Sequence, residues 1–315
     1  MTVLVTGANG FVGSALCVRL SGEAVSVRGT VRAPSLKLDC IETVVTGSLS
    51  VETDWTAALK NVDYVVHLAA RVHVINENIL DPLAEFRRVN VESTATLARQ
   101  AAAAGVRRFV FLSSIKVNGE FTKTGQPFTA DDQPAPETPY GVSKYEAELM
   151  LQQIAIETGM EVVIIRPPLV YGPGVQANFA TMMRWLVRGI PLPLASVIRN
   201  CRSLVALDNL VDLIVVCLKH PAAANQTFLV SDDEDLSTVE LLKRMGVAMR
   251  HPAHLFYLPP SLLKFGATIF HKQDIYHRLC CSLHLDINKT KHLLNWSPPV
   301  SVNEGLRLTA EGFCP

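Results

Sequence analysis

The first half of the chain alternates short apolar segments with longer helical ones. Apolar segments with the length of buried strands occur at 3–6, 25–31, 42–46, 62–67, 108–112 and 161–166. Helical patterns lie among them at 11–20, 82–104 and 139–158. Continuously apolar strands separated by helices are typical of a parallel sheet that helices cover on both faces. The sequence therefore predicts an α/β fold with a doubly wound parallel sheet.

Beyond residue 166 this alternation gives way to short helices and proline-rich turns. We therefore expect residues 1–166 to form the sheet domain, with later segments returning to it. Residues 167–315 are expected to form mainly a smaller, mostly helical lobe. A long loop rich in glycine and proline at 118–138 interrupts the first domain. Loops of that length inside compact domains are usually functional.

The overall composition excludes several classes of protein. Hydrophobic residues make up 49% of the chain and charged residues 18%, which rules out a disordered or coiled-coil protein. Lys and Arg total 29, as do Asp and Glu, so the chain has no excess of positive charge with which to bind nucleic acid. The cysteines include no CxxC pair and the histidines no HExxH pattern, so we expect neither a disulfide framework nor a metal site.

We see no signal for export or membrane insertion in the sequence. The first residues enter an apolar strand without a basic region, and no apolar run reaches the roughly 18–20 residues that cross a bilayer. We therefore expect a cytoplasmic protein without a transmembrane segment. The most apolar candidate, 255–270, is interrupted by Pro259, Pro260 and Lys264. A core helix is the favoured interpretation of this stretch, and a position on a membrane surface is the alternative.

A glycine-rich loop lies directly between the first strand and the first helix, where its glycines are spaced GxxGxxG. Glycine allows a tight turn and lets the backbone approach a pyrophosphate, which free N–H groups at the helix N-terminus then bind. This context predicts a Rossmann-type dinucleotide site that takes NAD or NADP. The cofactor-binding residues expected in the loop are Gly7, Asn9, Gly10, Phe11, Val12 and Gly13.

Tyr140 and Lys144 lie four positions apart on the helix predicted at 139–158, so their side chains share one face. A phenol has a reference pKa of about 10. An ammonium group one turn away, together with a positively charged nicotinamide, would lower it towards the range of a general base. Ser114 follows the strand at 108–112, where its hydroxyl can bond both a substrate oxygen and the tyrosine. A glycine loop, a serine and a YxxxK motif in this order are a strong functional signal.

These three motifs resemble those of the extended short-chain dehydrogenase/reductase superfamily, within its NAD-dependent epimerase/dehydratase branch. The resemblance covers nearly the whole chain. It is strongest to the bacterial UDP-glucose 4-epimerase-like group, which is linked to surface polysaccharide sugars. It implies that the second lobe binds a UDP-sugar substrate. It also implies a homodimer that pairs through the helices at 82–104 and 139–158.

The same resemblance implies further site residues. Asn90, on the long helix, corresponds to a family asparagine that supports the catalytic lysine through a water. Asn178 falls where the family contacts the uracil, and Arg202 where it contacts the diphosphate. An arginine fork suits a diphosphate because it can hold two oxygens at once. The remaining cofactor-binding residues that the resemblance implies are Leu68, Ala69, Ala70, Tyr140, Lys144 and Pro167.

Two positions depart from the family pattern. Dehydratases of this branch have acidic residues after the catalytic hydroxyl, whereas this chain has Ile115 and Lys116, so 4,6-dehydration lacks its acid and base. Lys116 either contacts the substrate or is a solvated turn residue. NAD-selective folds place Asp or Glu about 20 residues past the glycines, and this chain has Arg32 there. An arginine suits a 2′-phosphate, and the alternative is a surface charge that tolerates either cofactor.

These observations favour hydride chemistry at C4 of a UDP-hexose or UDP-N-acetylhexosamine, and 4-epimerisation above all. Tyr140, as phenolate, would remove the C4 hydroxyl proton while the C4 hydride passes to the nicotinamide. Ser114 would hydrogen-bond the C4 oxygen, and Lys144 would hold the nicotinamide ribose. Two alternatives remain. The same residues suit NADPH-dependent reduction of a UDP-4-keto-6-deoxy-hexosamine in O-antigen or capsule synthesis. A catalytically silent nucleotide-binding regulator would keep the fold without the reaction.

Overall fold

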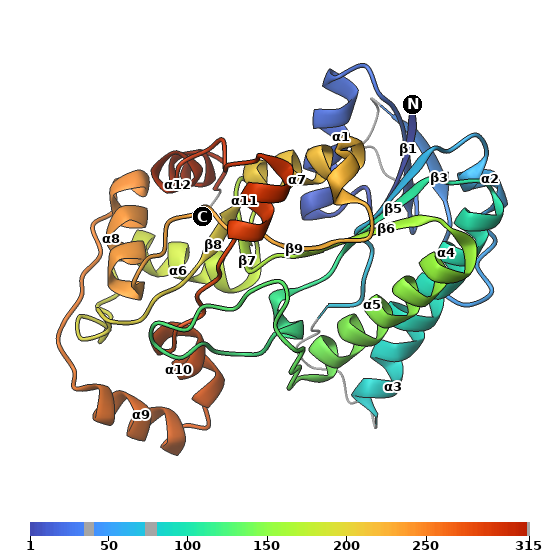
Figure 1. Ribbon diagram of the computed structural model, residues 1–315. Helices are drawn as coiled ribbons and strands as arrows, with labels where there is room; N and C mark the ends of the chain where they lie inside the picture. The colour runs from blue at the N-terminus through green and yellow to red at the C-terminus, as the bar shows by residue number, and fades with distance from the viewer. Residues whose placement is uncertain (35–40, 73–80, 314–315) are drawn as a thin grey trace.

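The computed structural model describes residues 1–34, 41–72 and 81–313. Its main sheet consists of β1 (Thr2–Thr6), β2 (Ser26–Val31), β3 (Glu42–Val45), β4 (Tyr64–His67), β5 (Arg108–Leu112), β6 (Glu161–Arg166) and β9 (Thr227–Leu229). All neighbours pair in parallel, in the order β3-β2-β1-β4-β5-β6-β9 (Figure 1). The chain therefore builds the sheet outward from β1 in both directions, which is the doubly wound arrangement. The predicted α/β fold with a parallel Rossmann sheet is confirmed.

Helices cover both faces of this sheet (Figure 1). One face is covered by α1 (Phe11–Gly22) and α7 (Leu207–Lys219), and the other by α2 (Thr56–Leu59), α4 (Ser93–Ala103) and α5 (Pro139–Thr158). Alternate strand residues point to opposite faces. Val3 and Val5 of β1 pack with the first group of helices, whereas Leu4 packs with the second. Because both faces are buried, the central strands are apolar throughout.

The helix predicted at 82–104 is divided into α3 (Pro82–Phe86), a π-helical segment η2 (Arg87–Glu92), and α4. Asp81 caps the start, since its carboxylate accepts a hydrogen bond from the Ala84 N–H at 3.0 Å. The predicted extent is therefore nearly correct, but the π turn was not expected. Such turns inside helices are rare and occur frequently at functional sites. Asn90 lies buried within this one.

The helix α5 is capped at both ends. The Thr138 hydroxyl accepts a hydrogen bond from the Gly141 N–H at 3.2 Å, and Pro139 occupies the first turn. Gly159 ends the helix in the left-handed conformation, with φ of +76°. The loop before α5 lies against the C-terminal part of the chain, because Phe128 exchanges backbone hydrogen bonds with His284 and Asp286 at 2.8 Å each.

The C-terminal part has its own hydrophobic cluster, built mainly on α6 (Ala177–Val187), α8 (Thr238–Met249) and α12 (Val302–Glu311). A second parallel pair, β7 (Leu169–Tyr171) and β8 (Leu204–Ala206), lies beside it. Three further short elements are described in this structure: η3 (Ile115–Val117), η4 (Pro221–Ala223) and α11 (Asn288–Leu294). Both α7 and β9 return to the main sheet, as expected for later segments. The boundary between the two parts at residue 166 stays a prediction.

The helices α9 (Pro260–Ile269) and α10 (Gln273–Cys280) contradict one expectation. Neither helix contains a buried residue. Phe265 is 64% exposed and Phe270 is 73% exposed. The interpretation of 255–270 as a core helix is therefore wrong, because an apolar composition does not determine whether other elements cover a helix. Among the described helices, none is both long and apolar enough to span a bilayer.

Candidate active site

The glycine loop between β1 and α1 has a backbone that only glycine fits. Gly7 has φ of +66°, and a Cβ atom there would lie 3.0 Å from the Ala69 nitrogen. A Cβ on Gly13 would lie 2.9 Å from the Ala8 Cα. Gly10 is the N-cap of α1 and contributes no side-chain cap to the N–H groups of the first turn. This cradle therefore fits the pyrophosphate of a dinucleotide, which accepts hydrogen bonds from such groups.

The neighbouring strands bring other predicted residues to this loop. The N–H groups of Leu68 and Ala69, which follow β4, both donate to the Thr6 hydroxyl at 3.2 Å. The Ala8 N–H donates to the Thr30 carbonyl of β2 at 3.2 Å. Arg32 follows β2 and is exposed at the same edge of the sheet. The carboxyl ends of the three strands thus converge where this fold binds its ligands.

Ser114 lies near the Tyr140 phenol and acts to lower its pKa. Ser114 also begins η3, since its hydroxyl accepts a hydrogen bond from the Lys116 N–H at 3.2 Å. Pro167 holds the same segment in place through its carbonyl, which accepts from the Ile115 N–H at 3.0 Å. The ends of β5 and β6 and the first turn of α5 therefore meet around the phenol.

Lys144 lies one helical turn after Tyr140 and is buried. Its Nζ lies 4.0 Å from the centroid of the Phe111 ring, a cation–π contact. Burial lowers the pKa of Lys144 to about 7, and the nearby Glu148 opposes that shift. The ammonium and amine forms are therefore both populated near neutral pH.

The expected lowering of the Tyr140 pKa is not found in the protein alone. Burial raises the pKa of Tyr140 to about 12, and the hydrogen bond from Ser114 lowers it only in part. The physical reason is that a buried phenolate loses its hydration, and this loss is the larger effect. A positive charge supplied by a bound nicotinamide is therefore the remaining means of stabilising the phenolate.

Asn90 connects two segments of the site. Its carbonyl accepts from the Arg71 N–H at 2.8 Å, and its amide donates to the Arg71 carbonyl and to the Ser143 hydroxyl, both at 3.0 Å. The chain that follows β4 is thereby fixed to α5 next to Lys144. The expected support of the lysine through a water stays a prediction, and this direct positioning role was not foreseen.

A buried ionic network beneath the site was also not foreseen. Glu148 accepts two hydrogen bonds from Arg166, at 2.6 and 3.0 Å, and one from the Ser113 hydroxyl at 2.5 Å. Arg166 also donates to the Asn118 side chain at 3.0 Å. This network ties together α5, β5 and β6. The spacing of Tyr140, Lys144 and Glu148, four residues each, is the signal that points to it.

His67 is a buried core residue. Its ring lies between the hydroxyls of Thr6, at 2.7 Å, and Thr94, at 2.9 Å, and stacks on Phe111. Burial, together with the charge of Lys144, lowers the pKa of His67 to about 3. The imidazole is therefore neutral under ordinary conditions.

The three predicted substrate residues are dispersed around the C-terminal side of the site. Lys116 forms an ion pair with Glu120 and is partly exposed. Asn178 is exposed in the first turn of α6. Arg202 is half-buried, and its guanidinium donates to the Cys281 carbonyl at 3.0 Å. Contacts of these residues with a substrate stay predictions.

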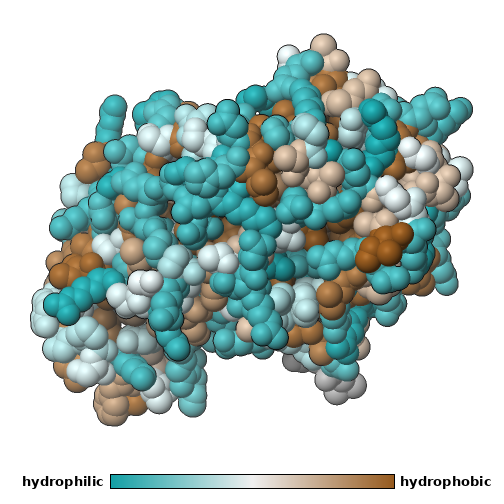
Figure 2. Space-filling view, viewed as in Figure 1, coloured by the Kyte–Doolittle hydropathy of each residue, from teal (hydrophilic) through white to brown (hydrophobic). Residues whose placement is uncertain are grey.

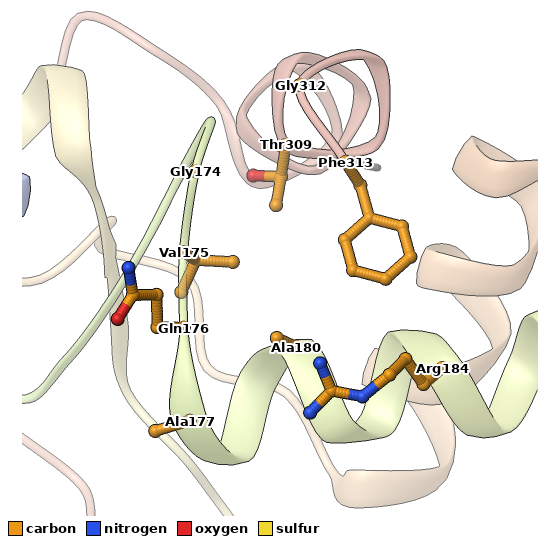
Figure 3. A pocket seen from close by; sticks show the side chains of 9 residues that line it. All are labelled: Gly174, Val175, Gln176, Ala177, Ala180, Arg184, Thr309, Gly312 and Phe313. Carbon is orange, nitrogen blue, oxygen red and sulfur yellow. The ribbon is translucent and has the colours of Figure 1, made fainter. Parts of the chain in front are cut away.

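A cavity of about 450 Å³ lies between α6 and the end of α12, away from Ser114, Tyr140 and Lys144. Figure 3 shows the side chains of Arg184, Thr309 and Phe313 around it. Asn178 precedes one of its lining residues, Ala180, by two positions. No catalytic group lines this cavity, so it is separate from the Tyr140 site.

Comparison with known proteins identifies close relatives over almost the whole chain. The chain is 47% identical over 313 residues to a UDP-glucose 4-epimerase of Vibrio cholerae, covering 99% of this chain and 95% of the relative. It is 29% identical to a UDP-glucose 4-epimerase of Mycolicibacterium smegmatis, covering 99% and 98% of the two chains.

Solved structures agree with the sequence comparison. The UDP-glucose 4-epimerase of Thermotoga maritima, solved with UDP-glucose, is 26% identical, with a TM-score of 0.78 and coverage of 99% and 98%. The UDP-glucuronic acid 4-epimerase of Bacillus cereus, solved with NAD, is 21% identical with a TM-score of 0.79, which shows the shared fold. The NAD dependent epimerase/dehydratase family matches residues 3–231. The resemblance inferred from the motifs is confirmed: the chain belongs to the NAD dependent epimerase/dehydratase family.

Proposed function

We propose that this protein interconverts the two C4 epimers of a UDP-hexose and retains NAD throughout the reaction. The observation that carries the proposal is that Tyr140 lies near Ser114 and one helical turn from Lys144, at the same edge of the sheet as the glycine cradle. The Vibrio cholerae relative is named a UDP-glucose 4-epimerase, which supports UDP-glucose and UDP-galactose as the first pair to test.

The side chains of this site account for the proton transfers of such a reaction. Tyr140, as phenolate, takes the proton of the C4 hydroxyl and later returns it. Ser114 hydrogen-bonds the C4 oxygen and keeps the phenol oriented. Bound NAD supplies the acceptor and donor of the C4 hydride and a positive charge near Tyr140. Lys144, in its ammonium form, would hold the nicotinamide ribose.

The remaining assignments follow the positions of the residues around this centre. Gly7, Asn9, Gly10, Phe11, Val12 and Gly13 would hold the pyrophosphate, with Arg32 at the adenosine ribose and Leu68, Ala69, Ala70 and Pro167 along the cofactor. Arg202, Asn178 and Lys116 would hold the diphosphate, the uracil and the sugar. We further propose a homodimer in the cytoplasm, where UDP-sugars are made.

The first test is to incubate the purified protein with UDP-glucose and separate the products by chromatography. UDP-galactose should form without added cofactor, and denatured protein should release near-stoichiometric NAD. Tyr140→Phe should lower the rate by about 10²–10⁴-fold while NAD stays bound. Stoichiometric consumption of NADPH with a UDP-4-keto sugar would instead assign a reductase. Bound NAD without turnover of any UDP-hexose would assign a regulator.

A further inference from the structure

The helical hairpin of α9 and α10 displays large apolar side chains to solvent. Most of its exposed apolar surface comes from residues between 256 and 275. The exposed apolar side chains of the hairpin are Leu262, Phe265, Ile269, Phe270 and Ile275, and the segment leading into α9 adds Phe256 and Tyr257. Monomeric proteins seldom leave a contiguous apolar surface of this kind uncovered, and such a surface marks an interaction site.

The exposed side chains of α9 form a stripe along one face of the helix. Leu262, Phe265 and Ile269 follow the i, i+3, i+7 spacing, so they share a face. Leu263 points the other way and packs against the C-terminal hydrophobic cluster. The helix is thus attached by one side and presents an apolar stripe on the opposite side, which the core of this chain does not use.

Positive charge accompanies this apolar surface. Lys264, Lys272 and Arg278 are exposed in the hairpin, whereas its acidic residue is Asp274. The whole chain is balanced, with 29 basic and 29 acidic residues, so the hairpin is more positive than the rest. In Figure 1 the hairpin lies at the lower left edge of the molecule, and Figure 2 shows apolar and polar residues side by side there.

We propose that the α9–α10 hairpin rests on the surface of a bilayer that contains anionic phospholipid. Aromatic and aliphatic side chains on one side of a helix, with Lys and Arg beside them, are typical of helices that lie in the plane of a membrane interface. A projecting hairpin, unlike a groove, can insert its apolar side chains into a flat surface. The positive charge of the hairpin complements anionic headgroups, and this favours a bilayer over another protein as the partner.

The hairpin is part of the proposed substrate lobe, residues 167–315. Cys281, directly after α10, accepts the hydrogen bond from Arg202 through its carbonyl. Bilayer contact would therefore hold the substrate side of the molecule near the membrane. This proposal does not depend on which sugar is the substrate, nor on the proposed reaction.

The test is sedimentation of the full-length protein with vesicles of phosphatidylglycerol and phosphatidylcholine, and with vesicles of phosphatidylcholine alone. The protein should bind the anionic vesicles and be released by high salt. Phe265→Ser combined with Ile269→Ser should lower the partition coefficient by at least about tenfold. The matched control, Val18→Ser combined with Val247→Ser, removes exposed apolar side chains outside the hairpin and should bind like the wild type.

Thermal unfolding of both double variants should match the wild type, since all four side chains are exposed. Lys272→Glu with Arg278→Glu should weaken binding to anionic vesicles only. Three outcomes would overturn the proposal: no binding of the wild type to anionic vesicles, equal loss in the control variant, or equal binding by the hairpin variant. A wild type that self-associates through the hairpin without binding vesicles would show that a second copy covers it instead.

Discussion

Lys144 is buried and Tyr140 is partly buried, and burial raises the pKa of the phenol while it lowers the pKa of the amine. Each shift favours the neutral form of its group. Burial therefore disfavours both the phenolate form of Tyr140, which a general base needs, and the ammonium form of Lys144. Ser114 acts against this effect at Tyr140, because its hydrogen bond lowers the pKa of Tyr140.

Ser114→Ala should therefore raise the pKa of Tyr140 further. Since the reaction needs the phenolate, the rate should rise with pH, and the rising limb should move to higher pH in the variant. At neutral pH the rate should fall by about 10²-fold or more. The measurement is the pH dependence of kcat for epimerisation, with NAD content as the control. A rising limb at the wild-type pH would show that Ser114 does not act on Tyr140.

His67 should make the protein sensitive to acid. Its pKa is about 3 in the folded protein, mainly because of burial, against about 6.5 in an unfolded chain. Below pH 6.5 the unfolded state binds a proton that the folded state does not, so the stability present above pH 6.5 is lost as the pH falls towards 3. This loss could reach about 4 kcal/mol.

His67→Gln should flatten that dependence, because glutamine does not titrate and can still bond to the Thr6 and Thr94 hydroxyls. The free energy of unfolding in urea, measured between pH 4 and pH 7.5, checks this. His292→Gln, at an exposed position, should keep the wild-type slope. If the unfolding free energy of His67→Gln depends on pH as in the wild type, another titratable group causes the loss of stability in acid.

Among the elements, the glycine loop and the first turn of α1 approach each other closely at Gly13. Gly13→Ala should force the loop open, because the added Cβ would meet the Gly7 carbonyl and the Ala8 Cα. We expect a loss of about 1–3 kcal/mol in unfolding free energy and the loss of NAD binding. Gly22, in the last turn of the same helix, has nothing within 4 Å of an added Cβ. Gly22→Ala should be neutral or stabilise by up to about 1 kcal/mol. Denaturant unfolding and NAD titration of both variants check this, and equal NAD affinities would contradict it.

The strands from β1 to β6 and the helix α5 could be predicted, because their local sequences have the length, apolar composition and end residues typical of such elements. The strands from β1 to β6 are short and mostly apolar, and α5 has Thr138 at one end and Gly159 at the other. The short β7, β8 and β9 were not predicted, since three residues form no recognisable pattern. β7 and β8 pair with each other, and β9 joins the main sheet beside β6, so tertiary packing rather than local sequence decides their pairing.

The site could be predicted at positions where the chemistry requires one residue type. It could be predicted less well at positions whose role depends on contacts between distant elements. The glycines, Ser114, Tyr140 and Lys144 occupy motif positions with a physical reason for each. The network of Glu148 and Arg166, the π turn around Asn90 and the exposure of α9 depend on which elements meet in space. The local sequence does not indicate these tertiary contacts, and for this reason the prediction that α9 is a core helix was wrong.

At the scale of the whole molecule, α5 carries both the catalytic residues and an apolar surface. Leu149 and Ile156 lie seven residues apart, so they share one face of α5, and they are 46% and 80% exposed. Neither residue is part of the core of this chain. The proposed homodimer would cover this face. Because a two-fold interface uses the same surface of both subunits, it would bury Leu149 and Ile156 of each copy.

Leu149→Asp with Ile156→Asp should therefore yield a monomer. Burying each wild-type side chain contributes about 1.5–3 kcal/mol, so removing both from two copies should weaken association by several orders of magnitude. Analytical ultracentrifugation at micromolar concentration should show a dimer for the wild type and a monomer for the variant. Val18→Asp with Val247→Asp, exposed on other helices, should leave the dimer intact. Because α5 carries Tyr140 and Lys144 at its other end, epimerase activity of the monomer would show whether pairing also stabilises the site. A variant that remains dimeric would place the interface away from α5.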